Sequence, residues 1–122
     1  MTRSSRSQFL NNSLNSTLKE TDNKSGSFDI PAVEIRIRTV SGNSKFIATL
    51  APAFTSDDAR GLISRVRREF PDASHHVSAF IIGGGRSVQE YCSDDGEPSG
   101  TAGKPLLTVI RGSGLGNAAL VV

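Results

Sequence analysis

The segment from Ser93 to Pro105 holds three acidic residues, three glycines, two prolines and one lysine, and almost no apolar side chain. Core packing cannot explain such a composition, because glycine and proline fix backbone geometry while Asp, Ser and Thr hydrogen-bond the backbone locally. The apolar run Leu106–Ile110 follows directly, so the sequence predicts a structured loop that leads into a buried helix. Loops held by rigid elements are where binding and catalytic residues concentrate, and this loop is the first candidate for function.

The glycine-rich end of the loop predicts an anion site. It differs from a Walker phosphate-binding loop, because two residues instead of four separate Gly100 from Gly103, and Pro105 follows Lys104. Backbone amides at the N-terminus of a helix, together with a lysine, can still hold a phosphate of a nucleotide or of RNA. The alternative is that the glycines only shape a turn and that Lys104 pairs with an acid of the loop. The candidate anion-binding residues are Thr101, Ala102, Gly103 and Lys104.

The acidic half of the loop is expected either to structure the loop or to contact a partner. An Asp-Asp-Gly sequence is ordinary turn chemistry, in which Asp accepts backbone hydrogen bonds. The same carboxylates are potential Mg²⁺ ligands, but the spacing of a calcium-binding loop is absent, so we predict no metal site and no cofactor. The candidate residues of this half are Ser93, Asp94, Asp95, Gly96, Glu97, Pro98 and Gly100.

Two adjacent histidines, His75 and His76, join these candidates. Adjacent residues of a strand face opposite sides, so the two side chains cannot share one metal ion. We expect one of them to hydrogen-bond the acidic loop and the other to be exposed. A nucleophilic pair of Cys92 with a histidine is the enzymatic alternative. No oxyanion arrangement flanks Cys92, however, and we predict no catalytic residue.

Positive charge is concentrated near the N-terminus. The net charge of +2 arises from residues 1–28, whereas residues 29–122 hold ten basic and ten acidic residues. Bulk charge therefore gives little support for nucleic-acid binding by the folded part. One helical face could still follow a phosphate backbone, although charged outer faces are often only solvated. The residues of this basic face are Arg60, Arg67 and Arg68.

Composition divides the chain at about residue 28. Residues 1–28 are rich in Ser, Asn and Thr, and they hold too few apolar side chains to offset chain entropy. We predict a disordered tail, with an organelle transit peptide as the alternative. Residues 29–122 are expected to form one domain. No apolar stretch is long enough to span a membrane, and a single cysteine fits a reducing compartment, so we expect a cytoplasmic protein.

The apolar pattern predicts the element order ββαββαβ. Two alternating runs around a turn at 41–44 predict a β-hairpin, and a helix is expected to begin after Thr55, where Asp58 resembles a capping box, and to end at Pro71. Later elements are strands at 77–82, 88–91 and 118–122, with a helix from about 101 or 105 to Arg111. The 77–82 strand is apolar on both faces and is expected to be interior. We expect an α+β sandwich with both helices on one face of a mostly antiparallel sheet.

Three segments together resemble the YigZ/IMPACT family. Ser44–Ala48, Phe70–His76 and, most specifically, Ser93–Pro105 stand in the order and spacing typical of that family, and the likeness covers residues 32–122. The resemblance implies a two-layer α+β sandwich similar to the second domain of ribosomal protein S5, a fold also seen in elongation factor G. It also implies a link to translation, because eukaryotic relatives modulate the general-control kinase pathway by binding its activator.

The chain differs from the family pattern at its C-terminus. Family members continue past the strand that begins at Ala118 into a stretch of Arg, Tyr, an aromatic residue and two glycines, and then into another helix. We therefore interpret residues 29–122 as a partial domain of the IMPACT N-terminal type, incomplete at the C-terminus. We expect an uncovered sheet face and, as a result, self-association. The residues of that face are Val33, Ile35, Phe46 and Val77.

These observations favour a non-enzymatic binding module associated with translation. Its expected partner is RNA, the ribosome or a translation-control protein, contacted through the Ser93–Pro105 loop and the basic helix face. The first alternative is a phosphate- or nucleotide-binding protein, or an enzyme of unknown reaction, that uses the same loop. The second is a non-functional truncated remnant.

Overall fold

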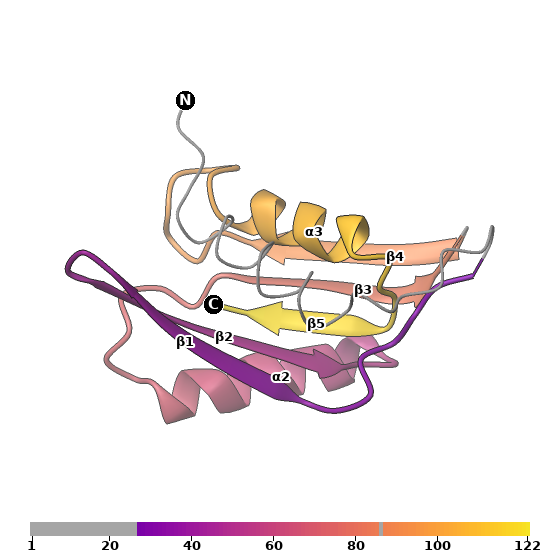
Figure 1. The fold of residues 1–122 in the computed structure, drawn as a ribbon, viewed down its shortest axis with the longest axis horizontal. Coiled ribbons are helices and arrows are strands. Elements are labelled where there is room, and N and C mark those ends of the chain that lie inside the picture. The colour runs from indigo at the N-terminus through magenta and orange to yellow at the C-terminus, as the bar shows by residue number, and fades with distance from the viewer. Residues whose placement is uncertain (1–26, 86) are drawn as a thin grey trace.

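A computed structural model describes residues 27–85 and 87–122, so the predicted tail lies outside the described residues except for its last two. The described elements follow the predicted ββαββαβ order, and the α+β class is confirmed (Figure 1). Neither described helix is long and apolar enough to cross a membrane. The elements are β1 (Ile35–Ser41), β2 (Ser44–Pro52), α2 (Ser56–Glu69), β3 (Ser78–Gly84), β4 (Ser87–Ser93), α3 (Gly103–Gly112) and β5 (Ala118–Val121).

The strands form one antiparallel sheet in the order β1-β2-β5-β3-β4. β1 and β2 are the predicted hairpin, which turns at Gly42 with a φ of 60°, a left-handed conformation that glycine adopts without strain. β3 is an interior strand, as its apolar sequence predicted. β5 comes last in the sequence but lies in the middle of the sheet, where it pairs with β2 and β3 and is fully buried.

The two helices pack on opposite faces of the sheet, so the prediction that both lie on one face is wrong. Ala118 and Leu120 of β5 belong to the core under α3, whereas Ala119 and Val121 belong to the core under α2. Successive side chains of a strand point to opposite faces. Because every side chain of β5 is apolar, both faces at the centre of the sheet require a cover. Figure 1 shows α3 and α2 on either side of the sheet.

The expectation of an uncovered face under Val33, Ile35, Phe46 and Val77 is only partly met. Val77 is fully buried in the core under α3, and Ile35 packs against that core. Val33 lies outside β1 and is 64% exposed, because the chain reaches the sheet only at Ile35. Since α3 covers the centre of this face, self-association of the chain stays a prediction.

The start of α2 has the predicted cap. The Thr55 hydroxyl accepts a hydrogen bond of 3.0 Å from the amide of Asp58, and the Asp58 carboxylate accepts one of 3.1 Å from the amide of Phe54. This reciprocal arrangement, a variant of the capping box, satisfies two amides near the helix N-terminus. Asp57 and Asp58 in the first turn and arginines in the last turn also complement the helix dipole.

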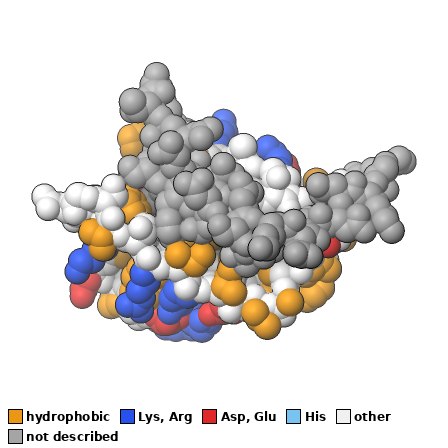
Figure 2. All heavy atoms as spheres, viewed as in Figure 1, with side chains coloured by type: hydrophobic (Ala, Val, Ile, Leu, Met, Phe, Trp, Pro, Cys, Tyr) orange, Lys and Arg blue, Asp and Glu red, His pale blue; other side chains and the backbone are white. Residues whose placement is uncertain are grey.

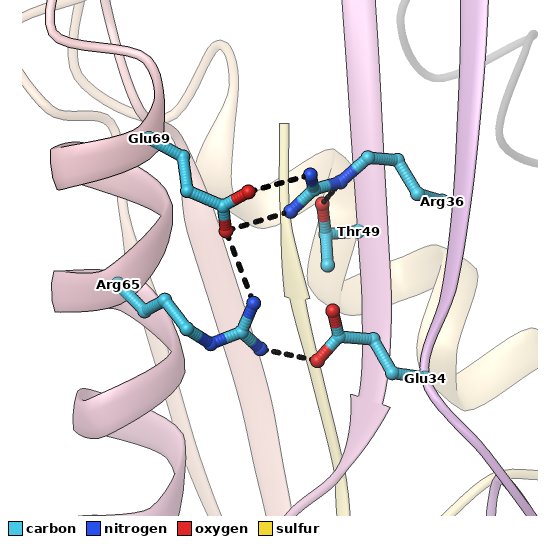
Figure 3. Close-up of polar contacts among 5 residues, drawn as sticks. All are labelled: Glu34, Arg36, Thr49, Arg65 and Glu69. Atoms are coloured by element: carbon cyan, nitrogen blue, oxygen red, sulfur yellow. Dashed lines mark hydrogen bonds and ion pairs between the residues drawn. The ribbon is translucent and has the colours of Figure 1, made fainter.

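A network of ion pairs ties the C-terminal half of α2 to β1 (Figure 3). Arg36 of β1 donates two hydrogen bonds to the Glu69 carboxylate, at 2.8 and 3.1 Å, and a third, at 3.0 Å, to the hydroxyl of the buried Thr49. Arg65 of α2 pairs with Glu69 and with Glu34. The network fixes α2 against the sheet and thereby determines where the remaining arginines of the helix project.

Candidate functional site

Asp94 organises the loop between β4 and α3. One oxygen of its carboxylate accepts hydrogen bonds from the amides of Gly103, at 2.7 Å, and Ala102, at 3.1 Å. The other oxygen accepts a hydrogen bond of 2.9 Å from the amide of Gly100. Asp94 therefore occupies the positive N-terminal end of α3, where an anion is stabilised by free amides and by the helix dipole.

This arrangement bears directly on the predicted anion site. The amides of Ala102 and Gly103 bind Asp94, and the amide of Thr101 donates to the carbonyl of Pro98 at 3.1 Å. None of the three is therefore available to an external phosphate in this conformation. Lys104 is exposed and has no ion-pair partner among the described residues. The structure thus brings the four candidate anion-binding residues together at the helix N-terminus, with a carboxylate of the chain in the place of the anion.

Asp95, the next residue, connects the loop to two other parts of the chain. Its φ of 48° lies in the left-handed region, which turns its carboxylate away from that of Asp94. This carboxylate accepts hydrogen bonds from the backbone amide of His76, at 2.6 Å, and from the guanidinium of Arg67, at 2.9 Å. Its backbone carbonyl accepts a hydrogen bond of 2.6 Å from Nδ1 of His75. The predicted loop, the histidine pair and the basic helix thus meet at one residue.

Neither histidine is exposed, which corrects the expectation that one of them would be. Both are half-buried, because both contact the Asp95 turn. Gly96, with a φ of 90°, permits the approach of His75: a Cβ at that position would lie 3.4 Å from the His75 ring. The His76 ring donates from Nε2 to the carbonyl of Phe70, at 2.8 Å, and its Nδ1 lies 3.8 Å from the Asp95 carboxylate.

The environment of the loop favours the ionised form of both aspartates. The amide hydrogen bond from Gly103, followed by those from Gly100 and Ala102 and by the charge of Lys104, holds the pKa of Asp94 below its usual value of 3.8. For Asp95, burial acts to raise the pKa, but the His76 amide and the Arg67 guanidinium outweigh it and the pKa is lowered. Both carboxylates therefore act as fixed negative charges that hold the loop together.

The outer face of α2 carries the basic residues that the sequence singled out. Arg67 pairs with Asp95, whereas Arg68 is exposed and has no ion-pair partner among the described residues. Arg60 is exposed as well, and its guanidinium lies 5.0 Å from the ring centre of Tyr91 and 5.8 Å from that of Phe80. Figure 2 shows basic and acidic side chains mixed along the lower edge of the molecule, in the region where Figure 1 places α2 and β1.

The sequence reasoning missed the aromatic part of this surface. Tyr91 and Phe80 are cross-strand partners in β4 and β3, and their rings stack with centres 4.8 Å apart and planes 20° from parallel. Tyr91 is the one aromatic residue in the mostly polar segment 87–93, and this was an available signal. Its contact with Arg60, however, spans three elements and is not a local pattern.

The remaining chemical hypotheses find no site in the described part of the chain. No group of three His, Cys, Asp or Glu side chains among residues 27–85 and 87–122 is placed to hold a metal ion. Cys92 packs against the core under α3, and no hydrogen bond joins it to either histidine in the described structure. The predicted members of the acidic half serve the turn: Ser93 accepts a hydrogen bond of 3.2 Å from the Asp95 amide, and the amide of Glu97 donates to the Asp94 carbonyl at 3.1 Å.

A pocket of about 380 Å³ lies next to this cluster, at the C-terminal end of α2. Its lining includes apolar side chains, charged side chains and both histidines. It is bounded by β2 on one side and by the end of β5 on another. The lining residues are Lys45, Phe46, Ile47, Val66, Glu69, Phe70, Pro71, Asp72, Ala73, His75, His76 and Val122.

Comparison with known proteins identifies the fold family. The family model of the Impact N-terminal domain matches residues 42–122, a range that includes α2, α3 and the whole Asp94–Asp95 turn. This chain belongs to the IMPACT family. The match confirms the resemblance seen in Ser44–Ala48, Phe70–His76 and Ser93–Pro105.

Individual relatives support the same assignment. The chain is 42% identical over 94 residues to the IMPACT family member YigZ of Escherichia coli K12, an alignment that covers 76% of this chain and 46% of the relative. It is 38% identical over 79 residues to the IMPACT family member YvyE of Bacillus subtilis 168, covering 65% of this chain and 36% of the relative. A crystal structure of a hypothetical protein superposes with a TM-score of 0.73 at 42% identity, over 75% of this chain and 45% of the other. The chain spans about half the length of the relatives it matches, or less.

Proposed function

We propose that this chain is a non-enzymatic binding module that acts in translation and contacts RNA through the outer face of α2. Membership of the IMPACT family supports a role of this type, and the chemistry of the surface supports the ligand. The observation that carries the proposal is a contrast between two polar regions. The amides and carboxylates of the Asp94–Asp95 turn hydrogen-bond within the chain, whereas Arg60 and Arg68 are exposed without acidic partners in the described structure.

The Asp94–Asp95 turn positions the C-terminal part of α2, which carries this surface. Asp95 holds Arg67 with a hydrogen bond of 2.9 Å and holds the His76 amide, so it fixes the C-terminal part of α2 relative to β3. Asp94 holds the start of α3 in the same loop. Polar groups that are hydrogen-bonded within the chain stabilise a scaffold, whereas exposed unpaired guanidinium groups can bind phosphate.

The electrostatic contribution is expected to be moderate. Residues 29–122 hold ten basic and ten acidic residues and carry no net charge, so long-range attraction to RNA is weak and binding depends on local contacts. Arginine is suited to such contacts because its planar guanidinium binds phosphate oxygens in pairs and stacks on bases. A few such contacts give micromolar rather than nanomolar affinity at physiological salt.

The test is a titration of labelled RNA by fluorescence anisotropy at several salt concentrations. A variant with Arg60, Arg67 and Arg68 all replaced by Gln is expected to bind at least about tenfold more weakly and to depend less steeply on salt, by about 0.7 in slope per lost phosphate contact. Arg111→Gln is the matched control, because Arg111 lies on the opposite sheet face in a pair with Glu90. Equal weakening by both changes would place the contact elsewhere, and unmeasurable binding of wild type would contradict the proposal.

A further inference from the structure

Three side chains from three different elements, Phe80, Tyr91 and Arg60, form one cluster on the α2 side of the sheet. The rings of Phe80 in β3 and Tyr91 in β4 lie 4.8 Å apart between centres. The guanidinium of Arg60, from the first half of α2, lies over both rings, 5.0 Å from Tyr91 and 5.8 Å from Phe80. Cation–π contacts of this geometry orient an arginine that would otherwise sample many rotamers.

The three side chains of this cluster differ in burial. Phe80 is 1% exposed and belongs to the core under α2, Tyr91 is half-buried, and Arg60 is exposed. The solvent-accessible part of the cluster therefore belongs to Arg60 and Tyr91. Arg60 makes no ion pair with a described residue, so no carboxylate competes for its guanidinium. An exposed guanidinium held in place by two rings offers a planar cation on which an unpaired nucleobase can stack, because every base presents a π-face.

Phosphate contacts are available along the same helix. Residues 60, 64, 67 and 68 recur at helical spacing and share one face, and all four are exposed. With a rise of 1.5 Å per residue, Arg67 and Arg68 lie roughly 10–12 Å along the axis from Arg60. An extended RNA strand along α2 could thus place a base on Arg60 while its neighbouring phosphates lie near the last turn.

We propose that Arg60 and Tyr91 form a stacking site for one unpaired base of single-stranded RNA. This inference rests on the proposed RNA contact and specifies the class of RNA that is bound. A double helix is a poor ligand for such a site, because its bases are already stacked on one another. The site predicts a preference for single strands over duplexes of equal charge.

The experiment separates stacking from phosphate attraction by comparing three labelled RNAs: a short single strand, an abasic strand with the same number of phosphates, and the corresponding duplex. Wild type is expected to bind the single strand about tenfold more tightly than the abasic strand, because stacking of one base contributes an affinity gain of about this size. Arg60→Lys keeps the charge but loses the planar guanidinium, so this variant should bind the single strand no more tightly than the abasic strand. Tyr91→Leu should act in the same way, with circular dichroism as the check on folding.

Arg111→Lys is the matched control, because Arg111 lies on the opposite face of the sheet in a pair with Glu90, and the preference of this variant for the single strand should equal that of wild type. If wild type binds the single strand and the abasic strand equally, or if Arg60→Lys retains the preference, the proposed stacking site is contradicted. The proposed contact with RNA would still hold in that case. If wild type binds none of the three RNAs, the proposed function itself fails and the stacking site with it.

Discussion

The amide of Gly103 donates a hydrogen bond of 2.7 Å to the carboxylate of Asp94, nine residues earlier in the chain. This bond closes the Ser93–Pro105 loop on itself and places a negative charge at the N-terminus of α3. A helix normally obtains such a cap from the residue that precedes it, but the N-cap position of α3 is Ala102, which has no side-chain acceptor. Asp94 therefore performs at a distance the role of a capping residue.

Replacing Asp94 with Asn should destabilise the domain. Asp94 accepts hydrogen bonds at both oxygens, from Gly100 and from Ala102 and Gly103, whereas Asn has one acceptor and places its amide donor against one of these N–H groups. We expect the melting temperature to fall by about 4–8 °C, as for loss of a helix cap in a domain of this size. Asp72→Asn is the control, since its exposed carboxylate has no hydrogen bond to a described residue. Equal melting temperatures for the two variants would contradict the capping role.

Stability should decrease in acid. The pKa values of Asp94 and Asp95 are both lowered in the fold, so each carboxylate adds stability above its unfolded value of 3.8 and loses it as the pH falls through the lower folded value. The free energy of unfolding, measured with denaturant at a series of pH values, should therefore decline below about pH 4. The decline should be shallower in Asp94→Asn, and an unchanged slope in that variant would remove Asp94 from the explanation.

Two glycines in helices should respond in opposite ways to alanine. A Cβ at Gly103 would lie 3.0 Å from the backbone of Ser93, so Gly103→Ala forces the loop and α3 apart. A Cβ at Gly61, in the exposed face of α2, would meet nothing within 4 Å. We expect Gly103→Ala to lower the free energy of unfolding by about 1–3 kcal/mol and Gly61→Ala to raise it by about 0.5–1 kcal/mol. Chemical denaturation of the two variants checks both signs at once.

The network in Figure 3 predicts unequal roles for two arginines of β1. Arg36 donates to the hydroxyl of Thr49, which is fully buried, and to Glu69. Its loss leaves a buried hydroxyl without its donor, so Arg36→Ala should cost about 1–3 kcal/mol of stability. Arg38 is exposed and lies only over the Phe70 ring, at 6.0 Å, so Arg38→Ala should cost less than about 1 kcal/mol. If urea unfolding shows that Arg36→Ala and Arg38→Ala lose similar free energies of unfolding, the contact of Arg36 with Thr49 does not contribute measurably to stability.

Local chemistry made much of the fold predictable. The turn at Gly42, the Thr55 cap and the stop before Pro71 depend on neighbouring residues, and each lies where the sequence placed it. The same holds for the loop at 93–105, which lies inside the range that the family model matches. The histidine pair was correctly associated with the acidic loop, but the prediction that one histidine is exposed failed because the Asp95 turn contacts both.

The sequence by itself determined the order of the elements, their ends and the family, because these follow from residue periodicity, turn chemistry and a contiguous motif. Tertiary structure alone decided which face each helix covers, since the all-apolar Ala118–Val121 strand is equally suited to a cover on either side until it lies between β2 and β3. It also decided that Arg67 meets Asp95 and that Arg60 rests on Tyr91, contacts between residues about thirty positions apart. Such pairings depend on strand order and helix placement, which no local pattern specifies.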